Sequence, residues 1–143
     1  MKPLDVDLQE IIPQRPPFVM IDGITDYEYE RVGTRLKIRP DNIFLDDGRF
    51  MPAGIIENIA QSCAARIGYH SWLQGLPIQI GLIGAVKHFV LHGQPRVNDT
   101  LDTVITVVGE AFGMVLINAE AFVDGEIMAT AEVKIALTEE KMG

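Results

Sequence analysis

One carboxylate interrupts an otherwise apolar run in the first half of the chain. Glu57 lies in the segment GIIENIAQ, and Gln61 follows it four residues later. In a helix, this spacing places both side chains on one face. A carboxyl group beside an amide could act as a general acid or base, with the amide orienting it or a water molecule. The alternatives are an acid that the helix dipole favours near the first turn and an amide at the edge of the core.

Arg49 and Gly54, which both precede Glu57 in the sequence, could bind a ligand. Arg49 stays protonated at neutral pH, so it cannot abstract a proton, but it could bind an oxyanion or a phosphate. Gly54 could bring a backbone N–H group close to a ligand. A surface ion pair for Arg49 and a glycine of no special role at the helix start are the alternatives.

Other catalytic groups are sparse in the sequence. His70 falls near the end of a predicted helix, where a cation is favourable. His88 and His92 would lie about 13 Å apart in a straight strand, too far to share a metal, although either could reach a site from a partner subunit. Cys63 lies in an apolar stretch, where an inert buried thiol is expected. We recognise no metal-ligand cluster, serine–histidine–acid pattern or nucleotide-binding motif, so we expect no metal and no cofactor.

A long helix is predicted to position Glu57. Apolar residues recur at spacings of three and four from Gly54 to about Leu73, which indicates one buried stripe. The members of this stripe are Ile56, Ile59, Ala60, Cys63, Ile67 and Tyr69. Gly75 and Pro77 predict the end of the helix. A short helix is expected at about residues 8–12.

Strands are predicted for most of the remaining chain. Two precede the long helix and four follow it, and Asp124-Gly125 predicts a hairpin between the last two. The expected strands are 18–28, with Gly23 as a bulge, 31–40, 78–91, 100–110, 112–123 and 126–138, and residues 41–54 are expected to form a loop. This order predicts one α+β domain over residues 1–143, with the helix packed on a curled antiparallel sheet.

Composition limits the possible partners. The net charge of −8 argues against general nucleic-acid binding. Basic residues nevertheless alternate along one predicted strand, where they form either a solvated face or a docking surface for an acidic carrier protein; they are Arg31, Arg35, Lys37 and Arg39. No apolar run reaches about 18 residues, so no membrane span is expected. The acidic N-terminal segment and the single cysteine favour the cytoplasm.

Several segments resemble the β-hydroxyacyl-acyl-carrier-protein dehydratases, which have the hotdog fold. IIPQRPPFVMIDGI is similar to the opening of that family, with Gln14 where a histidine is usual. FMPAGIIENIAQ is similar to its helix motif, and VNDT and VDGEIMATAEVKIA to later segments. The family carries a histidine in a loop before the helix, whereas Arg49 stands in that place here. A divergent branch associated with polyene and other specialised acyl pathways also lacks this histidine and is a nearer match.

The resemblance implies a curled antiparallel sheet wrapped around one long central helix. It also implies chemistry on a 3-hydroxyacyl thioester, in which a histidine takes the C2 proton and the helix carboxylate assists the departing hydroxyl group. Glu57 matches this carboxylate, Gln61 its neighbour, and Gly54 the backbone donor that polarises the thioester carbonyl. Arg49 and Phe50 would contact the substrate, with Phe50 lining an apolar tunnel for the acyl chain, although Phe50 could equally be a core residue.

Three functions are compatible with these features: an acyl-carrier-protein-linked dehydratase with altered catalytic residues, an acyl thioesterase in which Glu57 or Gln61 directs a water, and a non-catalytic subunit of an active hotdog partner. The expected ligand is an acyl thioester on acyl carrier protein or coenzyme A. An otherwise exposed strand edge after residue 78 predicts a homodimer or larger homo-oligomer, or a heterodimer with a related hotdog subunit. We expect neither nucleic acid nor a membrane as a partner.

Overall fold

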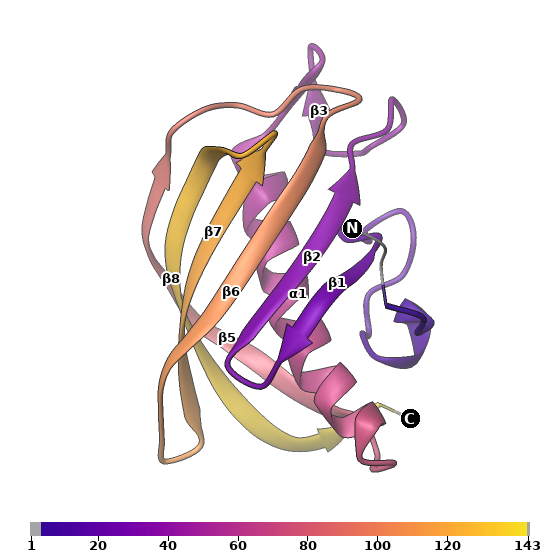
Figure 1. Cartoon of the computed structure of the whole chain (residues 1–143), viewed down its shortest axis with the longest axis vertical. Helices are drawn as coiled ribbons and strands as arrows, with labels where there is room; N and C mark the ends of the chain where they lie inside the picture. The colour runs from indigo at the N-terminus through magenta and orange to yellow at the C-terminus, as the bar shows by residue number, and fades with distance from the viewer. Residues whose placement is uncertain (1–3, 143) are drawn as a thin grey trace.

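A single antiparallel sheet of six strands forms the body of the protein. The structure, a computed structural model, describes residues 4–142, so residues 1–3 and 143 of the predicted domain lie outside the described residues. The strand order is β1-β2-β6-β7-β8-β5 (Figure 1). The strands are β1 Gly23–Glu28, β2 Arg31–Lys37, β5 Gln79–Leu91, β6 Thr100–Ala111, β7 Met114–Val123 and β8 Glu126–Lys141.

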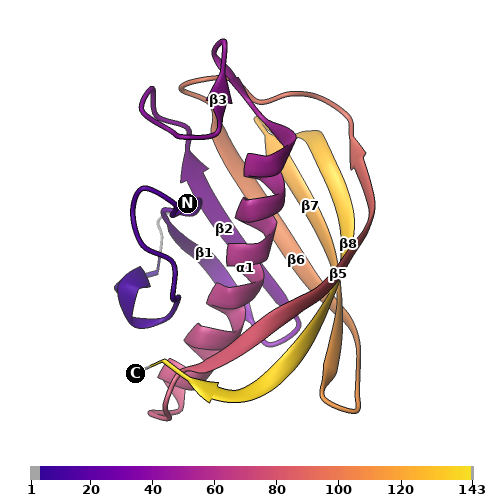
Figure 2. The same cartoon turned by 180° about the vertical axis from the view of Figure 1, so that it is seen from behind.

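One long helix, α1 Pro52–Leu73, lies against the concave face of this sheet (Figure 2). The N-terminal segment, with the short 3-10 helix η1 Leu8–Glu10, runs beside the helix near β1 and β2. The predicted α+β class, with a curled antiparallel sheet around one long helix, is therefore confirmed.

Alternation of side chains explains why the sheet buries one face. In β7, Val115, Ile117, Ala119 and Ala121 are buried, and the residues between them are exposed. Both residues of the Asp124-Gly125 turn have positive φ angles, 50° and 80°, as a two-residue hairpin turn with the twist of the strands requires. The predicted hairpin between β7 and β8 is confirmed.

Several predicted boundaries shift. β1 begins at Gly23 rather than at residue 18, and its irregularity falls between Ile24 and Asp26 rather than at Gly23. The expected loop at 41–54 contains a two-stranded ribbon, β3 Leu45–Asp46 and β4 Arg49–Phe50. These pairs are too short to produce an alternating pattern in the sequence.

The helix is buried over a wider arc than one apolar stripe. Three residues predicted to be buried are half-buried: Ile56, Ala60 and Tyr69. Three polar residues are instead fully buried: Asn58, Gln61 and Ser62. Sheet and N-terminal segment together enclose the helix, so polar side chains that find partners can replace apolar ones.

Candidate functional site

Glu57 lies in the second turn of α1. The helix begins at Pro52 after the N-cap Met51, two residues earlier than predicted, and its first turn holds no acidic residue. Because the influence of the helix dipole falls off within the first turn, the dipole explanation for Glu57 loses much of its force. The Glu57 side chain is half-buried and accepts a hydrogen bond from Gln61, with 2.8 Å between Gln61 Nε2 and Glu57 Oε1.

Gln61 ties this carboxylate to the N-terminal segment. Its side chain has no exposed surface. Gln61 Oε1 accepts the Met20 N–H group at 2.6 Å, and Nε2 donates to the Phe18 carbonyl oxygen at 2.8 Å. Its amide is therefore fixed in one orientation, with a donor directed at Glu57.

Asn58 provides a second tie between the helix and the N-terminal segment. Asn58 Nδ2 donates to the Met20 carbonyl oxygen at 2.8 Å, and Asn58 Oδ1 accepts from the Thr103 hydroxyl at 2.6 Å. Ser62 hydrogen-bonds to Thr34 at 2.7 Å. Each of these partners lies at least 28 residues away in the sequence, so sequence reasoning gave no indication of this network.

Glu57 belongs to the side of the helix that the chain leaves partly open. Ile56 and Glu57, with Ala60 and Ala64 one and two turns further on, are each half-buried. Strand β5 forms one edge of the sheet and exposes large apolar side chains: Leu82 at 56%, Ile83 at 42%, Val90 at 46% and Leu91 at 42%. An unpaired edge with this composition is a typical surface for association.

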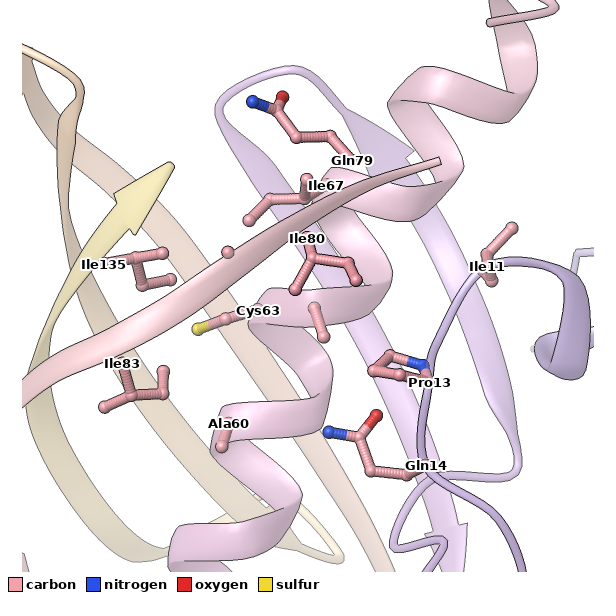
Figure 3. Close-up of a pocket in the computed structure, with 12 residues that line it drawn as sticks. Ile11, Pro13, Gln14, Ala60, Cys63, Ile67, Gln79, Ile80, Ile83 and Ile135 are labelled. Carbon is pink, nitrogen blue, oxygen red and sulfur yellow. The ribbon is translucent and has the colours of Figure 1, made fainter. Parts of the chain in front are cut away.

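A small cavity of about 70 Å³ lies between the helix, β5 and the N-terminal segment (Figure 3). Its lining is mostly apolar and includes Ala60, Cys63, Ala64, Ile67, Ile80, Ile83 and Ile135. Gln14 lies at the end near Ala60, and Gln79 lies at the opposite end. The Oε1 atom of Gln14 is buried without a hydrogen-bond partner among the described residues. Glu57 is one helical turn before Ala60, at the Gln14 end.

The residues predicted to bind substrate have separate environments. Gly54 donates its N–H to the Met51 carbonyl at 2.9 Å, and a Cβ at this position would lie 2.6 Å from the Phe50 ring. Close packing thus accounts for this glycine. Phe50 is fully buried in the core and does not line the cavity. Binding roles for Gly54 and Phe50 stay predictions.

Arg49 is exposed at the end of the molecule from which the helix starts. The backbone of Arg49 pairs with the backbone of Arg96 in an isolated antiparallel β-bridge, and Arg96 is also exposed. Neither guanidinium forms an ion pair within residues 4–142. Like charges directly opposite each other destabilise a strand pair, so an anionic ligand would stabilise this arrangement. Arg96 was not singled out from the sequence, because its position opposite Arg49 depends on the fold.

No histidine side chain forms a hydrogen bond with Glu57 among the described residues. His70 is 13 residues further along α1, which corresponds to about 20 Å of helix, and its Nδ1 lies 3.0 Å from the Tyr27 hydroxyl. His88 lies on the outer face of the sheet, 2.8 Å from Glu132. His92 is exposed just after β5.

Cys63 is buried, as predicted, and burial raises the pKa of its thiol to about 12, partly offset by Arg66. Among residues 4–142 no three metal-ligating side chains of the His, Cys, Asp and Glu types are grouped around a common point. None of the helices in this range is long and apolar enough to span a membrane.

Three of the basic residues on or just after β2 already have partners within the protein. Arg35 forms an ion pair with Asp102 at 3.0 Å, and Arg39 forms one with Asp22 at 3.2 Å. Lys37 donates to the Asn98 carbonyl oxygen. A solvated face with its own counter-charges therefore describes this strand better than a free basic docking surface.

The curled antiparallel sheet around one central helix defines a hotdog-fold protein. The structure superposes on the dehydratase heterocomplex ApeI:P from Xenorhabdus doucetiae with a TM-score of 0.86, at 15% sequence identity and over 94% of this chain and 93% of that one. At this identity the superposition establishes the fold.

Sequence comparisons define the family. A family model described as ApeP-like, ApeP dehydratase, matches residues 6–142. The 3-hydroxyacyl-[acyl-carrier-protein] dehydratase FabZ of Bacillus cytotoxicus is 31% identical over 94% of this chain and 95% of its own length. FabZ of Aliivibrio fischeri is 25% identical over 93% and 92%. The chain belongs to the ApeP-like dehydratase family, and the predicted resemblance to a divergent hotdog dehydratase branch is confirmed.

Proposed function

We propose that this chain contributes Glu57 to a 3-hydroxyacyl-thioester dehydratase site that a second hotdog subunit completes. The observation that carries the proposal is the position of Glu57. Its carboxylate is held by the fixed Gln61 amide, lies on the partly open side of the helix and is one turn from an apolar cavity. A thioester whose chain enters the cavity would have its reacting carbons beside this carboxylate.

Glu57 would act as the acid of the elimination. A base takes the C2 proton, the C3–O bond breaks, and the electron pair of the C2–H bond forms the C2–C3 double bond. Glu57, in its protonated form, gives its proton to the departing hydroxyl group, which leaves as water. Gln61 acts as a positioning residue, since its N–H group keeps the carboxyl group in one rotamer.

The base is proposed to come from another subunit. Gln61 is the side chain to which Glu57 is hydrogen-bonded, and none of the three histidines shares a hydrogen bond with it in the described residues. The partner is a second copy of the chain or a related hotdog subunit that carries the loop histidine. Pairing along β5 would cover the exposed residues Leu82 and Ile83 together with the open side of the helix.

Arg49 and Arg96 are proposed to bind a phosphate group of the acyl carrier. Two guanidinium groups that have no acidic partner among residues 4–142 favour a phosphate, which accepts paired N–H donors. Both acyl carrier protein and coenzyme A provide such a phosphate beside the thioester arm. A cytoplasmic location is part of the proposal, since one buried free thiol suits a reducing compartment.

The test is a turnover assay on a 3-hydroxyacyl thioester, with the chain alone and with its co-purifying hotdog partner. Enoyl thioester formed by the wild-type assembly, and lost on replacement of Glu57 by glutamine, supports the proposal. Release of free thiol without enoyl product would instead indicate a thioesterase. Full enoyl formation by an assembly that contains the glutamine variant would assign the chain a non-catalytic role.

A further inference from the structure

Arg66 is the one charged side chain that is buried among the described residues. It is 5% exposed, and charged side chains are almost never buried to this degree without a partner of opposite charge. Within residues 4–142 Arg66 forms no ion pair. Its Nε–H group donates to the Tyr29 carbonyl oxygen at 2.9 Å, and its guanidinium carbon lies 4.8 Å from the centre of the Tyr29 ring. Arg66 lies about two turns before the end of α1, so the helix dipole, which acts within the last turn, does not account for this cation.

The terminal nitrogens of Arg66 open onto a hollow at the end of α1. They form no hydrogen bond with the described part of the chain, and neither is sealed from solvent. The hollow measures about 170 Å³, whereas one water molecule takes about 30 Å³ of liquid, so a small organic ion fits. Its lining combines Arg66 and His70 with the ring of Tyr29 and with two aliphatic side chains, Ile67 and Leu137.

His70 provides a second donor one turn after Arg66, on the same face of the helix. Its ring packs edge-on against Tyr29 with 5.2 Å between the ring centres, and its Nδ1 atom lies 3.0 Å from the Tyr27 hydroxyl. Burial raises the pKa of this hydroxyl, partly offset by Arg66, so the hydroxyl keeps its proton and can donate it to Nδ1. The neutral ring then carries its own proton on Nε2, which has no hydrogen-bond partner among residues 4–142.

Glu110 also lines the hollow and limits the charge of a ligand. Its two carboxylate oxygens accept the Tyr29 hydroxyl, at 2.9 and 3.1 Å, and do not pair with Arg66. Because Glu110 repels negative charge, a monoanion fits this hollow better than a phosphate dianion. A carboxylate also matches the planar guanidinium group, from which it can accept two parallel N–H bonds.

The hollow is separate from the Glu57 site but adjoins the apolar cavity. Arg66 follows Glu57 by nine residues, about 13.5 Å along the helix axis. Ile67 and Gln79 line both spaces and lie at the same end of the cavity (Figure 3). Arg66 itself lines the hollow and not the cavity. A ligand beside Arg66 would therefore leave the Glu57 end of the cavity free.

We propose that Arg66 and His70 bind the carboxylate group of a small organic monoanion at this end of α1. The guanidinium group donates to both carboxylate oxygens, and His70 Nε2 donates to one of them. The aliphatic part of the ligand packs against Ile67 and Leu137. This binding gives the buried cation its counter-ion and does not depend on dehydratase chemistry, so failure of the proposed function would leave it standing.

The experiment titrates the intact protein with butyrate and, separately, with butyramide, which has the same number of heavy atoms and no charge. Nuclear magnetic resonance of the Arg66 Nε–H group and of the His70 ring reports binding, at constant ionic strength in chloride. Butyrate should shift both resonances in a saturable way, and butyramide should bind at least about tenfold more weakly. Inorganic phosphate at pH 7.5 should also bind more weakly than butyrate, because of Glu110.

Three variants test the residues. Arg66→Met should weaken butyrate binding at least about tenfold, read from the His70 ring. Lys87→Met is the control: it removes one positive charge at an exposed position about 26 Å from Gln79 along β5, and should leave the affinity unchanged. Glu110→Gln should tighten butyrate binding about two- to fivefold, because a like charge is removed. Glu110 is exposed, so this variant still tests the site if Arg66→Met does not fold.

Several results would refute the site: no saturable shift with butyrate, equal binding of butyrate and butyramide, or an unchanged affinity in folded Arg66→Met or in Glu110→Gln. Tighter binding of phosphate than of butyrate would overturn the assignment to a monocarboxylate.

Discussion

Replacing Gln61 by leucine should separate the structural role of this amide from the chemical role of Glu57. Leucine leaves the Met20 N–H group without its acceptor inside the protein and removes donors from Phe18 and Glu57. One unsatisfied buried donor costs about 1–3 kcal/mol and each lost hydrogen bond about 0.5–1.5 kcal/mol, partly offset by the apolar side chain. We therefore expect Gln61→Leu to lower the free energy of unfolding by about 2–4 kcal/mol.

Glu57→Gln is the matched control. Glu57 is half-buried, and a glutamine oxygen can still accept the Gln61 N–H group, so the free energy of unfolding should change by less than about 1 kcal/mol. Urea unfolding followed by fluorescence of the single tryptophan, Trp72, measures both variants at one fixed protein concentration, because oligomer stability depends on concentration. A Gln61→Leu protein within about 1 kcal/mol of the wild type would refute the reasoning.

Three further predictions concern packing, reactivity and assembly. Gly68→Ala should lower the free energy of unfolding in urea by about 1–3 kcal/mol, because the new Cβ would overlap the Ile11 carbonyl oxygen. Gly109→Ala is the control and should be nearly neutral, since its Cβ meets no atom within 4 Å. Equal effects of the two substitutions would contradict this prediction. Burial raises the pKa of Cys63 to about 12, so only about one thiol in ten thousand is ionised at pH 8. Iodoacetamide should therefore label the unfolded chain fully and leave the folded protein unlabelled. Rapid labelling of the folded protein would contradict the burial of Cys63. Ile83→Lys on β5 should lower the molar mass measured by light scattering toward that of a monomer. Val108→Lys, at an exposed position of β6, is the control and should leave the mass unchanged. An unchanged mass for Ile83→Lys would exclude β5 as the interface.

Local patterns in the sequence were enough to predict the main elements. The spacing of apolar residues predicted α1, runs of strand-type sequence predicted β6, β7 and β8, and Asp124-Gly125 predicted the hairpin between β7 and β8. Each of these signals is carried by residues that are neighbours along the chain. Ile56, Ala60 and Tyr69 were wrongly predicted to be buried because the deeply buried positions of α1 include polar residues, which an apolar pattern cannot find.

The candidate site was predictable only in part. Glu57 and Gln61 are one turn apart, so their hydrogen bond follows from helix geometry. The Gln61 amide is fixed by hydrogen bonds to the backbone of Phe18 and Met20. These residues lie 43 and 41 positions away in the sequence, so no local pattern contains this information. The unpaired Gln14 oxygen and the pairing of Arg49 with Arg96 likewise arise only when distant segments meet.

The most direct measurement is single-turnover dehydration of a 3-hydroxyacyl thioester by the intact assembly, with wild-type chain and with Glu57→Gln. Loss of a positioned general acid should lower the rate of enoyl formation by about 10²–10⁴-fold, while the affinity for a 3-hydroxyacyl pantetheine amide stays nearly the same. A rate within about threefold of the wild type, on a chain shown to be folded and assembled, would contradict a chemical role for the Glu57 carboxylate.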